Sequence, residues 1–180
     1  MKMFKRFAAA LLAGVMVLAM LTACGGGSGS GTSAVGEEFE NKYIAAINTV
    51  RGENAEKLEN DTELRNKALA QLAKIKEDGT IAPTDANTSI VTYDTDGKPT
   101  TVIMISVGTA NKGEVVDGVC QAKEITPESL EKDITTDSSD AEVVEILQAL
   151  NRVGIATKVI NGKTYGAVAM EIVRAVSDNA

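Results

Sequence analysis

Residues 100–107 constrain the fold of this chain more than any other segment. They read Thr-Thr-Val-Ile-Met-Ile-Ser-Val and are almost continuously apolar. A strand with one solvent-exposed face alternates apolar and polar residues, whereas a strand that is covered on both faces is a continuous apolar run. We therefore expect a central strand here, with other elements packed against both of its sides.

The other strand signals in the chain predict antiparallel neighbours. Residues 89–93 are rich in β-formers and precede a turn at residues 94–97. Near the C-terminal end, residues 153–160 and 163–173 are joined by an Asn-Gly pair. Because Asn-Gly supplies the two positive-φ positions of a type I′ turn, this is the strongest hairpin signal in the chain.

Two helices are expected before the first strands. Apolar residues recur at helical spacing over residues 37–51, which Gly52 ends, and again over residues 60–79. Asn60 and Glu63 stand in capping-box positions, so the second helix is expected to begin at Asn60. The predicted buried positions are Phe39, Tyr43, Ala46, Ile47 and Val50 in the first helix, and Leu64, Ala68, Leu72 and Ile75 in the second.

Two further helices are expected between the strand pairs. Thr126 and Pro127 are typical of a helix start, here reaching about residue 133, and Ser139 with Glu142 predicts a helix that ends near residue 151. Residues 108–118 are rich in glycine and are expected to be irregular. The order α-α-β-β-α-α-β-β favours the α+β class, with helices packed on a mainly antiparallel sheet in one domain, residues 37–180.

The N-terminal segment has a different composition and a different expected role. Residues 1–6 carry three basic residues and no acidic one, and residues 7–20 are apolar. That apolar length is typical of a secretory signal peptide and short for a helix that spans a membrane. Residues 25–36 consist largely of Gly and Ser, which is typical of a flexible tether with a reach of about 20 Å.

Between these two segments, Leu21-Thr22-Ala23-Cys24 resembles the lipobox of bacterial lipoproteins. The resemblance implies a signal peptide over residues 1–23, cleavage between Ala23 and Cys24, and a diacylglycerol on the Cys24 thiol. Further acylation of the new amino terminus, for example with palmitate, would make the anchor stable. Residues 24–36 then form the lipidated cysteine and its tether. A plain secretory peptide, in which Cys24 is incidental, and an uncleaved anchor helix are the alternatives.

This resemblance places the folded domain outside the cytoplasm. It implies a domain that is anchored to the lipid bilayer through Cys24, on the extracytoplasmic face of a bacterial membrane, at the cell surface or in the periplasm. Removing residues 1–23 with their three basic residues changes the net charge of the chain from −7 to −10. Nucleic acid and anionic lipid headgroups are therefore not expected as direct partners.

Composition removes several classes of chemistry. The chain of 180 residues contains no His, so it lacks the commonest general base and the commonest zinc ligand. Aromatic residues make up only 3%, and stacking platforms for bases or carbohydrates are not expected. Two Cys residues cannot form a disulfide framework or a thiolate metal site.

Residues at the two ends of the expected domain resemble a known family. Asn48 and Arg51 stand in an Asn-x-x-Arg arrangement on the first expected helix. The other matching positions are Leu58, Leu64, Ala68 and Ala73 around the second helix, and residues 153–156 and 162–165 in the closing hairpin. Together they resemble the CAP domain, also called SCP, of cysteine-rich secretory proteins, antigen 5 and pathogenesis-related 1 proteins. The resemblance implies an α-β-α sandwich.

The departures from this family bear on function. Many CAP domains carry a cleft with two His and two acidic residues that can hold a divalent metal, and this chain supplies neither His. No catalytic, cofactor-binding or metal-ligating residue is therefore carried over. We expect a degenerate, non-catalytic binding or interaction module, with a cell-wall polymer, an envelope protein or a small apolar ligand as its partner. The alternative is an envelope hydrolase that uses carboxylates of raised pKa in place of His.

The remaining polar candidates have structural interpretations. Asp94 and Asp96 superficially match a calcium loop, but Ile105 occupies its twelfth position, so a turn is expected. Asp137, Asp140 and Glu142 surround a helix start, where the helix dipole favours acidic residues and a weak cation site is the alternative. Glu37, Glu38, Glu40, Glu53, Glu56 and Glu59 are expected to be solvated.

Cys120, Asn48 and Arg51 could each have either a structural or a functional role. Cys120 is the only thiol that remains once Cys24 is acylated, and we expect a small apolar core residue, with a reactive or pairing thiol as the alternative. Asn48 and Arg51 are expected to bond to neighbouring loops, with ligand binding as the alternative.

Overall fold

The computed structural model describes residues 33–133 and 141–173. Its helices are α2 (Ala34–Arg51), α3 (Thr62–Leu72), α4 (Pro83–Ala86), α5 (Pro127–Asp133) and α6 (Ala141–Gln148), with a short 3₁₀ helix, η1 (Ala110–Gly113). Its strands are β1 (Thr80–Ile81), β2 (Asn87–Tyr93), β3 (Pro99–Val107), β4 (Val115–Val116), β5 (Val119–Gln121), β6 (Glu124–Ile125), β7 (Arg152–Ile160) and β8 (Lys163–Val173). The expected α+β class is confirmed.

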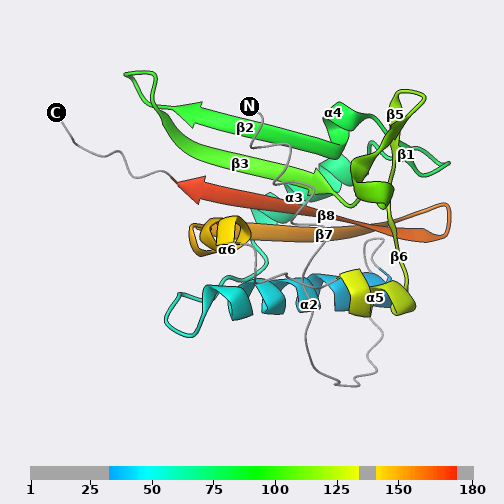
Figure 1. Cartoon of the computed structure of the whole chain (residues 1–180), viewed down its shortest axis with the longest axis horizontal. Helices are drawn as coiled ribbons and strands as arrows, with labels where there is room; N and C mark the ends of the chain where they lie inside the picture. Colours follow the sequence, from blue (N-terminus) through cyan, green and yellow to red (C-terminus); the bar gives the residue numbers. More distant parts are fainter. Residues whose placement is uncertain (1–32, 134–140, 174–180) are drawn as a thin grey trace.

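The main sheet has five strands and is built around β8 (Figure 1). On one side β8 pairs with β7 along its length, and on the other it pairs with β3 and with the short β6. β2 pairs with the other side of β3, so β2 and β7 form the two long edges, and the two-residue β6 pairs with β8 alone among the described strands. All of these pairings are antiparallel, and the apolar run at residues 100–107 lies in the interior strand β3, as predicted.

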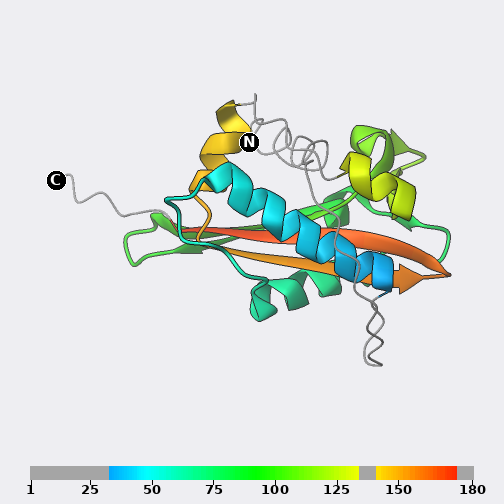
Figure 2. The ribbon, with the colours of Figure 1, turned by 90° about the horizontal axis from the view of Figure 1, so that it is seen from below.

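Helices cover both faces of this sheet (Figure 2). α2, α5 and α6 lie on one face, where Val168 and Met170 of β8 join their hydrophobic cluster. α3 lies on the other face, where Ala167 and Ala169 of the same strand join a second cluster. Because side chains alternate along a strand, the two halves of the core are built from successive residues of β7 and β8.

Two glycines of the main hairpin set how closely the helices approach it. A Cβ at Gly154 in β7 would lie 2.1 Å from the backbone N of Arg65, so the start of α3 rests directly on this strand. A Cβ at Gly166 in β8 would lie 2.9 Å from a ring carbon of Phe39, on the α2 side. Both layers therefore depend on positions where no side chain fits.

The first helix begins three residues earlier than expected, at Ala34. Ser33 caps it, because the Ser33 Oγ accepts a hydrogen bond from the backbone N of Gly36 at 3.1 Å. A second hydrogen bond of 2.9 Å joins Ser33 Oγ and Thr164 Oγ1, which ties the cap to β8. Residues 34–36, which were assigned to the tether, therefore belong to the folded domain. The expected buried stripe of this helix is confirmed for Phe39, Tyr43, Ala46 and Ile47, and Val50 packs against it half-buried.

The second helix differs from its prediction at both ends. Its N-cap is Asp61, whose carboxylate accepts from the backbone N of Leu64 at 2.9 Å, because the Asn60 side chain is engaged with β7 instead. The helix ends at Leu72, and the chain then turns through Gly79, which has a φ of 81°. The expected buried face is confirmed, since Leu64, Ala68, Leu72 and Ile75 all lie in the second cluster.

The middle of the chain contains structure that was not expected. Residues 108–118 contain η1 and β4, and β1, β5 and β4 form a separate three-stranded sheet. Strands of two or three residues carry no readable periodicity, so the glycine content dominated the prediction. α4 lies in a segment where no helix was expected, and α6 ends at Gln148 rather than near residue 151. Ser139 of the expected capping box lies outside the described residues.

The strongest turn and helix-start predictions are confirmed. Asn161 and Gly162 have φ values of 48° and 77°, as a type I′ turn requires. Asp94 Oδ1 accepts hydrogen bonds from the backbone N atoms of Asp96 and Lys98, which explains these residues as a turn. α5 begins at Pro127 as predicted.

Candidate functional site

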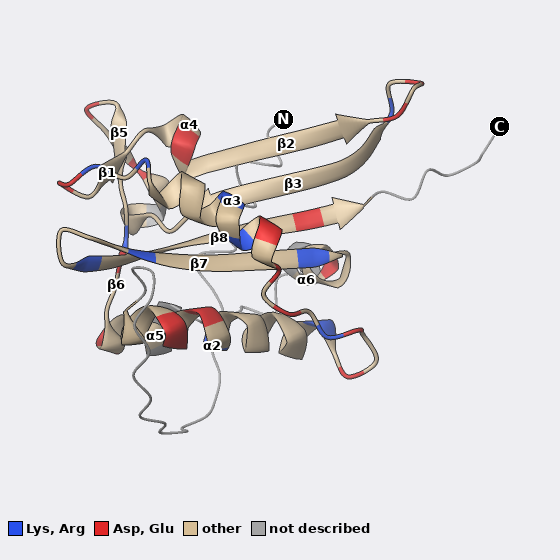
Figure 3. Cartoon of the chain, turned by 180° about the vertical axis from the view of Figure 1, so that it is seen from behind, with Lys and Arg blue, Asp and Glu red and all other residues tan. Residues whose placement is uncertain are grey.

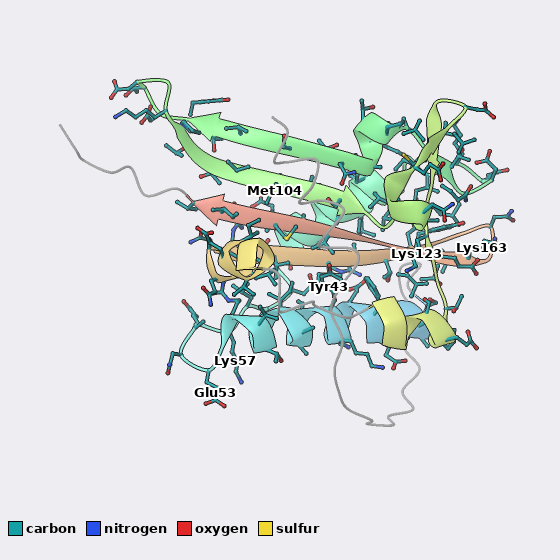
Figure 4. All side chains as sticks on the ribbon, viewed as in Figure 1. Tyr43, Glu53, Lys57, Met104, Lys123 and Lys163 are labelled. Atoms are coloured by element: carbon teal, nitrogen blue, oxygen red, sulfur yellow. The ribbon has the colours of Figure 1, made fainter. Side chains whose placement is uncertain are left out.

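A polar groove lies at the C-terminal end of α2, lined by Arg51, residues 56–62 and residues 150–152. We call it the α2-end groove. Its volume of about 670 Å³ is within the range typical of small-molecule sites. Figure 4 shows Lys57 at this end of α2. The helix has 18 residues, so at a rise of 1.5 Å per residue the groove lies about 27 Å from the Ser33 end of the helix.

Arg51 closes one end of the groove by binding backbone carbonyls of two segments. Its Nη1 donates to the carbonyl oxygens of Leu147 at 2.9 Å and Leu150 at 2.7 Å, and its Nη2 donates to that of Glu56 at 3.3 Å. A cation at the C-terminal end of α6 also interacts favourably with the helix dipole. Arg51 therefore holds the α2–α3 loop and the end of α6 together.

Asn48 fixes the same loop from the next turn of α2. Its Nδ2 donates to the carbonyl oxygen of Leu58 at 2.8 Å, and its Oδ1 accepts from the backbone N of Leu58 at 2.8 Å. This pair of bonds satisfies both backbone groups of one loop residue. The prediction that Asn48 and Arg51 bond to neighbouring loops is confirmed.

A buried carboxylate of α2 bonds to β7 and α3. Glu40, only 7% exposed, accepts from the backbone N and the Oγ1 of Thr157 at 2.8 Å each, and from Nε of Arg65 at 3.0 Å. The expectation that Glu40 is solvated is therefore wrong. It lies three residues before Tyr43 and seven before Ile47, so its helical position falls at the margin of the buried stripe, a signal that was present in the sequence.

An ion-pair cluster forms the other end of the groove. Arg152 donates from Nε and Nη2 to the two carboxylate oxygens of Glu171 at 2.8 and 2.7 Å, and from Nη1 to Asp61 at 3.2 Å and Glu63 at 3.3 Å. The hydrogen bonds from Glu171 raise the pKa of Arg152. The backbone N–H of Leu64 and, to a smaller extent, Arg152 lower the pKa of Asp61. The pKa of Glu63 is lowered by hydrogen bonds from Lys67 and Arg152.

This cluster was missed by sequence reasoning. Arg152 and Glu171 are cross-strand partners of β7 and β8, whereas Asp61 and Glu63 come from the start of α3. The hairpin register was readable from the turn, so the Arg152–Glu171 pair could have been found. No local pattern indicates that α3 begins beside Arg152.

A second, apolar cavity lies between α2 and the sheet. It is lined by Phe39, Tyr43, Gly108, Lys123, Ile125, Gly166 and Val168, and it encloses about 20 Å³. That volume has room for about one water molecule. Tyr43 is seen between α2 and the sheet in Figure 4, and burial raises the pKa of its phenol.

The structure places the other sequence candidates as follows. Cys120 is 3% exposed and lies in the second cluster, so its predicted core role is confirmed. Cys24, the expected lipidation site, and Ala23 lie outside the described residues, as do Asp137 and Asp140. Within residues 33–133 and 141–173, no three His, Cys, Asp or Glu side chains are grouped so that they could hold a metal ion.

Comparison with known proteins does not assign a function to this groove. No family model, curated protein or solved structure matches this chain. Among the described helices, none is both long and apolar enough to cross a membrane. The sequence motifs and the α2-end groove are therefore the basis for a functional proposal.

Proposed function

We propose that this chain is a lipid-anchored protein on the extracytoplasmic face of a bacterial membrane, and that its domain binds a polar envelope component in the α2-end groove. The anchor rests on Leu21-Thr22-Ala23-Cys24 and on the Gly/Ser-rich tether that follows. The domain itself we infer to be a divergent, degenerate CAP/SCP-like module. That inference is supported by the helices on both faces of the sheet and by Asn48 and Arg51 on the first helix.

The position of the groove relative to the tether carries this proposal. The tether reaches the domain at Ser33, at the N-terminal end of α2, and the groove lies at the other end, about 27 Å away along an 18-residue helix. Because the attachment point and the groove lie at opposite ends of α2, anchoring through Cys24 leaves the groove accessible to the envelope. The bonds of Asn48 and Arg51 hold both walls before a ligand arrives, which lowers the entropic cost of binding.

The charges at the groove favour one class of ligand. Glu56, Lys57 and Glu59 are exposed and present both signs of charge. Such a surface suits a ligand that carries both ammonium and carboxylate groups, as the peptide-bearing polymer of a bacterial cell wall does. A small apolar ligand is less well served, because the apolar cavity under α2 encloses only about 20 Å³.

The alternative function, a hydrolase based on carboxylates, finds little support at the groove. A general acid needs a carboxyl group of raised pKa. Asp61 and Glu63 have lowered pKa values and both are ion-paired with Arg152, so they stay ionised near neutral pH. We therefore propose binding without catalysis.

The first experiment tests the anchor. Mass spectrometry of the protein from its native host is expected to show a chain that begins at Cys24 and carries acyl groups. The Cys24→Ala variant is expected to retain its leader and to lack the acyl mass. An intact leader on the wild-type chain, or an unmodified thiol at Cys24, would contradict the lipoprotein assignment.

The second experiment tests the groove. Soluble peptide-bearing wall fragments are titrated into the protein by calorimetry, with Lys57→Glu as the groove variant and Lys98→Glu, in the β2–β3 turn, as the matched control. We expect binding that Lys57→Glu weakens at least tenfold and Lys98→Glu leaves unchanged. Binding that both variants weaken equally would contradict the site, and no binding of wall fragments would contradict the proposed ligand class.

A further inference from the structure

The two long edges of the main sheet, β7 and β2, differ in how far other segments of the chain cover them. At the β7 edge, the Asn60 side chain bonds both backbone groups of Ile155, with N–O distances of 2.9 and 2.8 Å. The backbone N of Asp61 donates to the carbonyl oxygen of Val153 at 2.8 Å, and Glu40 accepts from the backbone N of Thr157. The α2–α3 region thus occupies three successive outward positions of β7.

The β2 edge has no comparable cover within the described residues. β3 is the one strand there that pairs with β2, and the side chains that bond to β2 reach the Thr88 hydroxyl or come from β3. Edge strands in natural proteins are normally protected by charge, by proline or by a covering segment. β2 reads Asn-Thr-Ser-Ile-Val-Thr-Tyr and contains neither charge nor proline. Figure 3 shows β2 uncharged along its length, with charged residues on α4 just before it and at the turn that follows.

We infer that β2 is a homotypic docking edge, on which the β2 strand of a second copy of this chain pairs in antiparallel orientation about a two-fold axis at Ile90. This interaction goes beyond the proposed function: it does not involve the α2-end groove, and it rests on the proposed anchor only for the local concentration of the copies. It joins two five-stranded sheets into one continuous sheet.

The sequence of β2 is self-complementary in this register. Ile90 faces Ile90 of the second copy, Thr88 faces Thr92, and Ser89 faces Val91, so all seven residues are paired and no charge faces a like charge. β-branched and Thr–Thr cross-strand pairs of this kind stabilise antiparallel strands. Ile90 is 43% exposed, so pairing at the axis covers an apolar side chain that is now in contact with solvent.

The ends of the strand are also compatible with a second copy. In this register Asp94 falls opposite Ala86, and Asp85 falls opposite Thr95. Asp85 is ion-paired with Lys74 at 2.8 Å, so its charge is locally balanced. An unrelated peptide strand would need to match this uncharged pattern, whereas a second copy matches it by symmetry, as isologous interfaces do.

One strand pair buries less surface than the roughly 1,200–2,000 Å² of a standard stable interface. The pairing is therefore expected to be weak in dilute solution and to increase with local concentration. Copies held on one membrane would meet this condition.

The test is disulfide cross-linking of the full chain in whole cells. Directly opposite residues of antiparallel strands have Cα atoms about 4.5–5.5 Å apart, which a disulfide can span. Ile90→Cys is therefore expected to give a covalent dimer under mild oxidation. Tyr93→Cys is the control, because Tyr93 is more exposed, at 62%, yet lies six residues from its symmetry mate along the strand, roughly 20 Å away. We expect at least tenfold less dimer from it.

A second variant distinguishes cross-linking through β2–β2 pairing from cross-linking through random encounters of exposed cysteines. Thr92→Lys added to Ile90→Cys places a charge in the paired edge and is expected to reduce the dimer at least fivefold, whereas Asn66→Lys, exposed on α3, is expected to leave it unchanged. Equal cross-linking by Ile90→Cys and Tyr93→Cys, absence of a dimer, or cross-linking of Ile90→Cys to a different protein would each overturn the inference. Mass spectrometry of Cys24 in the same cells reports on the anchor separately, so a failure of the anchor and a failure of the pairing are distinguishable.

Discussion

Gly154→Ala should destabilise this domain more than Gly166→Ala, the equivalent change in β8. Gly154 lies where the first turn of α3 crosses β7, and the nearest atoms to an added Cβ are the backbone N of Arg65 at 2.1 Å and the carbonyl carbon of Leu64 at 2.3 Å. These are helix backbone atoms, which cannot move aside by a rotamer change. The substitution therefore requires α3 and β7 to separate.

The size of the effect follows from these distances. Ordinary van der Waals contact begins at 3.4 Å, so the two elements must move apart by about 1.3 Å. Overpacking of a core costs about 1–3 kcal/mol when side chains can adjust, and here the backbone must move, so we expect a loss of about 3 kcal/mol. The movement also strains the 2.8 Å bond between the Asp61 N and the Val153 carbonyl oxygen. Such a loss is a large part of the roughly 5–15 kcal/mol by which domains are stable.

Urea unfolding followed by circular dichroism measures this loss, using a chain that starts after Cys24. In a thermal scan followed by the same signal, the melting temperature of Gly154→Ala is expected to fall by roughly 10 °C. Gly118→Ala is the matched control, because its Cβ meets open space, although its φ of 80° still makes the substitution cost about 1 kcal/mol. If Gly154→Ala were no more destabilising than Gly118→Ala, the close contact between α3 and β7 would be wrong.

Three shorter predictions concern buried and charged groups. The folded domain lowers the pKa of Asp61, so its carboxylate stabilises the fold above about pH 4 and this stabilisation is lost as the pH falls through the lower, folded pKa. Asp61→Asn keeps a good N-cap and removes only the charge. In urea titrations, the difference in free energy of unfolding between wild type and this variant should therefore shrink below pH 4. A difference that stays constant from pH 7 to 2 would contradict this. Glu40→Gln should cost about 3 kcal/mol in the same assay, because an amide NH₂ would face the donors around Glu40, whereas the exposed Glu38→Gln should be near neutral. Cys120 is 3% exposed, so a thiol reagent should modify it at least 100-fold faster in urea than in buffer, and equal rates would place it at the surface instead.

The candidate site was only partly predictable from sequence. Asn48 and Arg51 were identified through the resemblance to the CAP domain, and their role as loop-binding residues was expected. Glu40 was assigned to the solvated face because its charge outweighed its helical position. The groove itself could not be predicted, since its walls come from the α2–α3 loop and the α6–β7 segment, which are about 90 residues apart in sequence.

The same distinction applies to the whole molecule. Local chemistry determined the main hairpin, the apolar faces of α2 and α3, the start of α5 and the α+β class, because each depends on residues a few positions apart. The tertiary structure decided which face of the sheet each helix covers, where Arg152 finds its carboxylates, and that β7 is covered at its edge while β2 pairs with β3 alone among the described strands. These features depend on contacts between segments that are distant in sequence. The free energy of such contacts is shared across the packed layers, and the contacts produce no periodic pattern in the sequence.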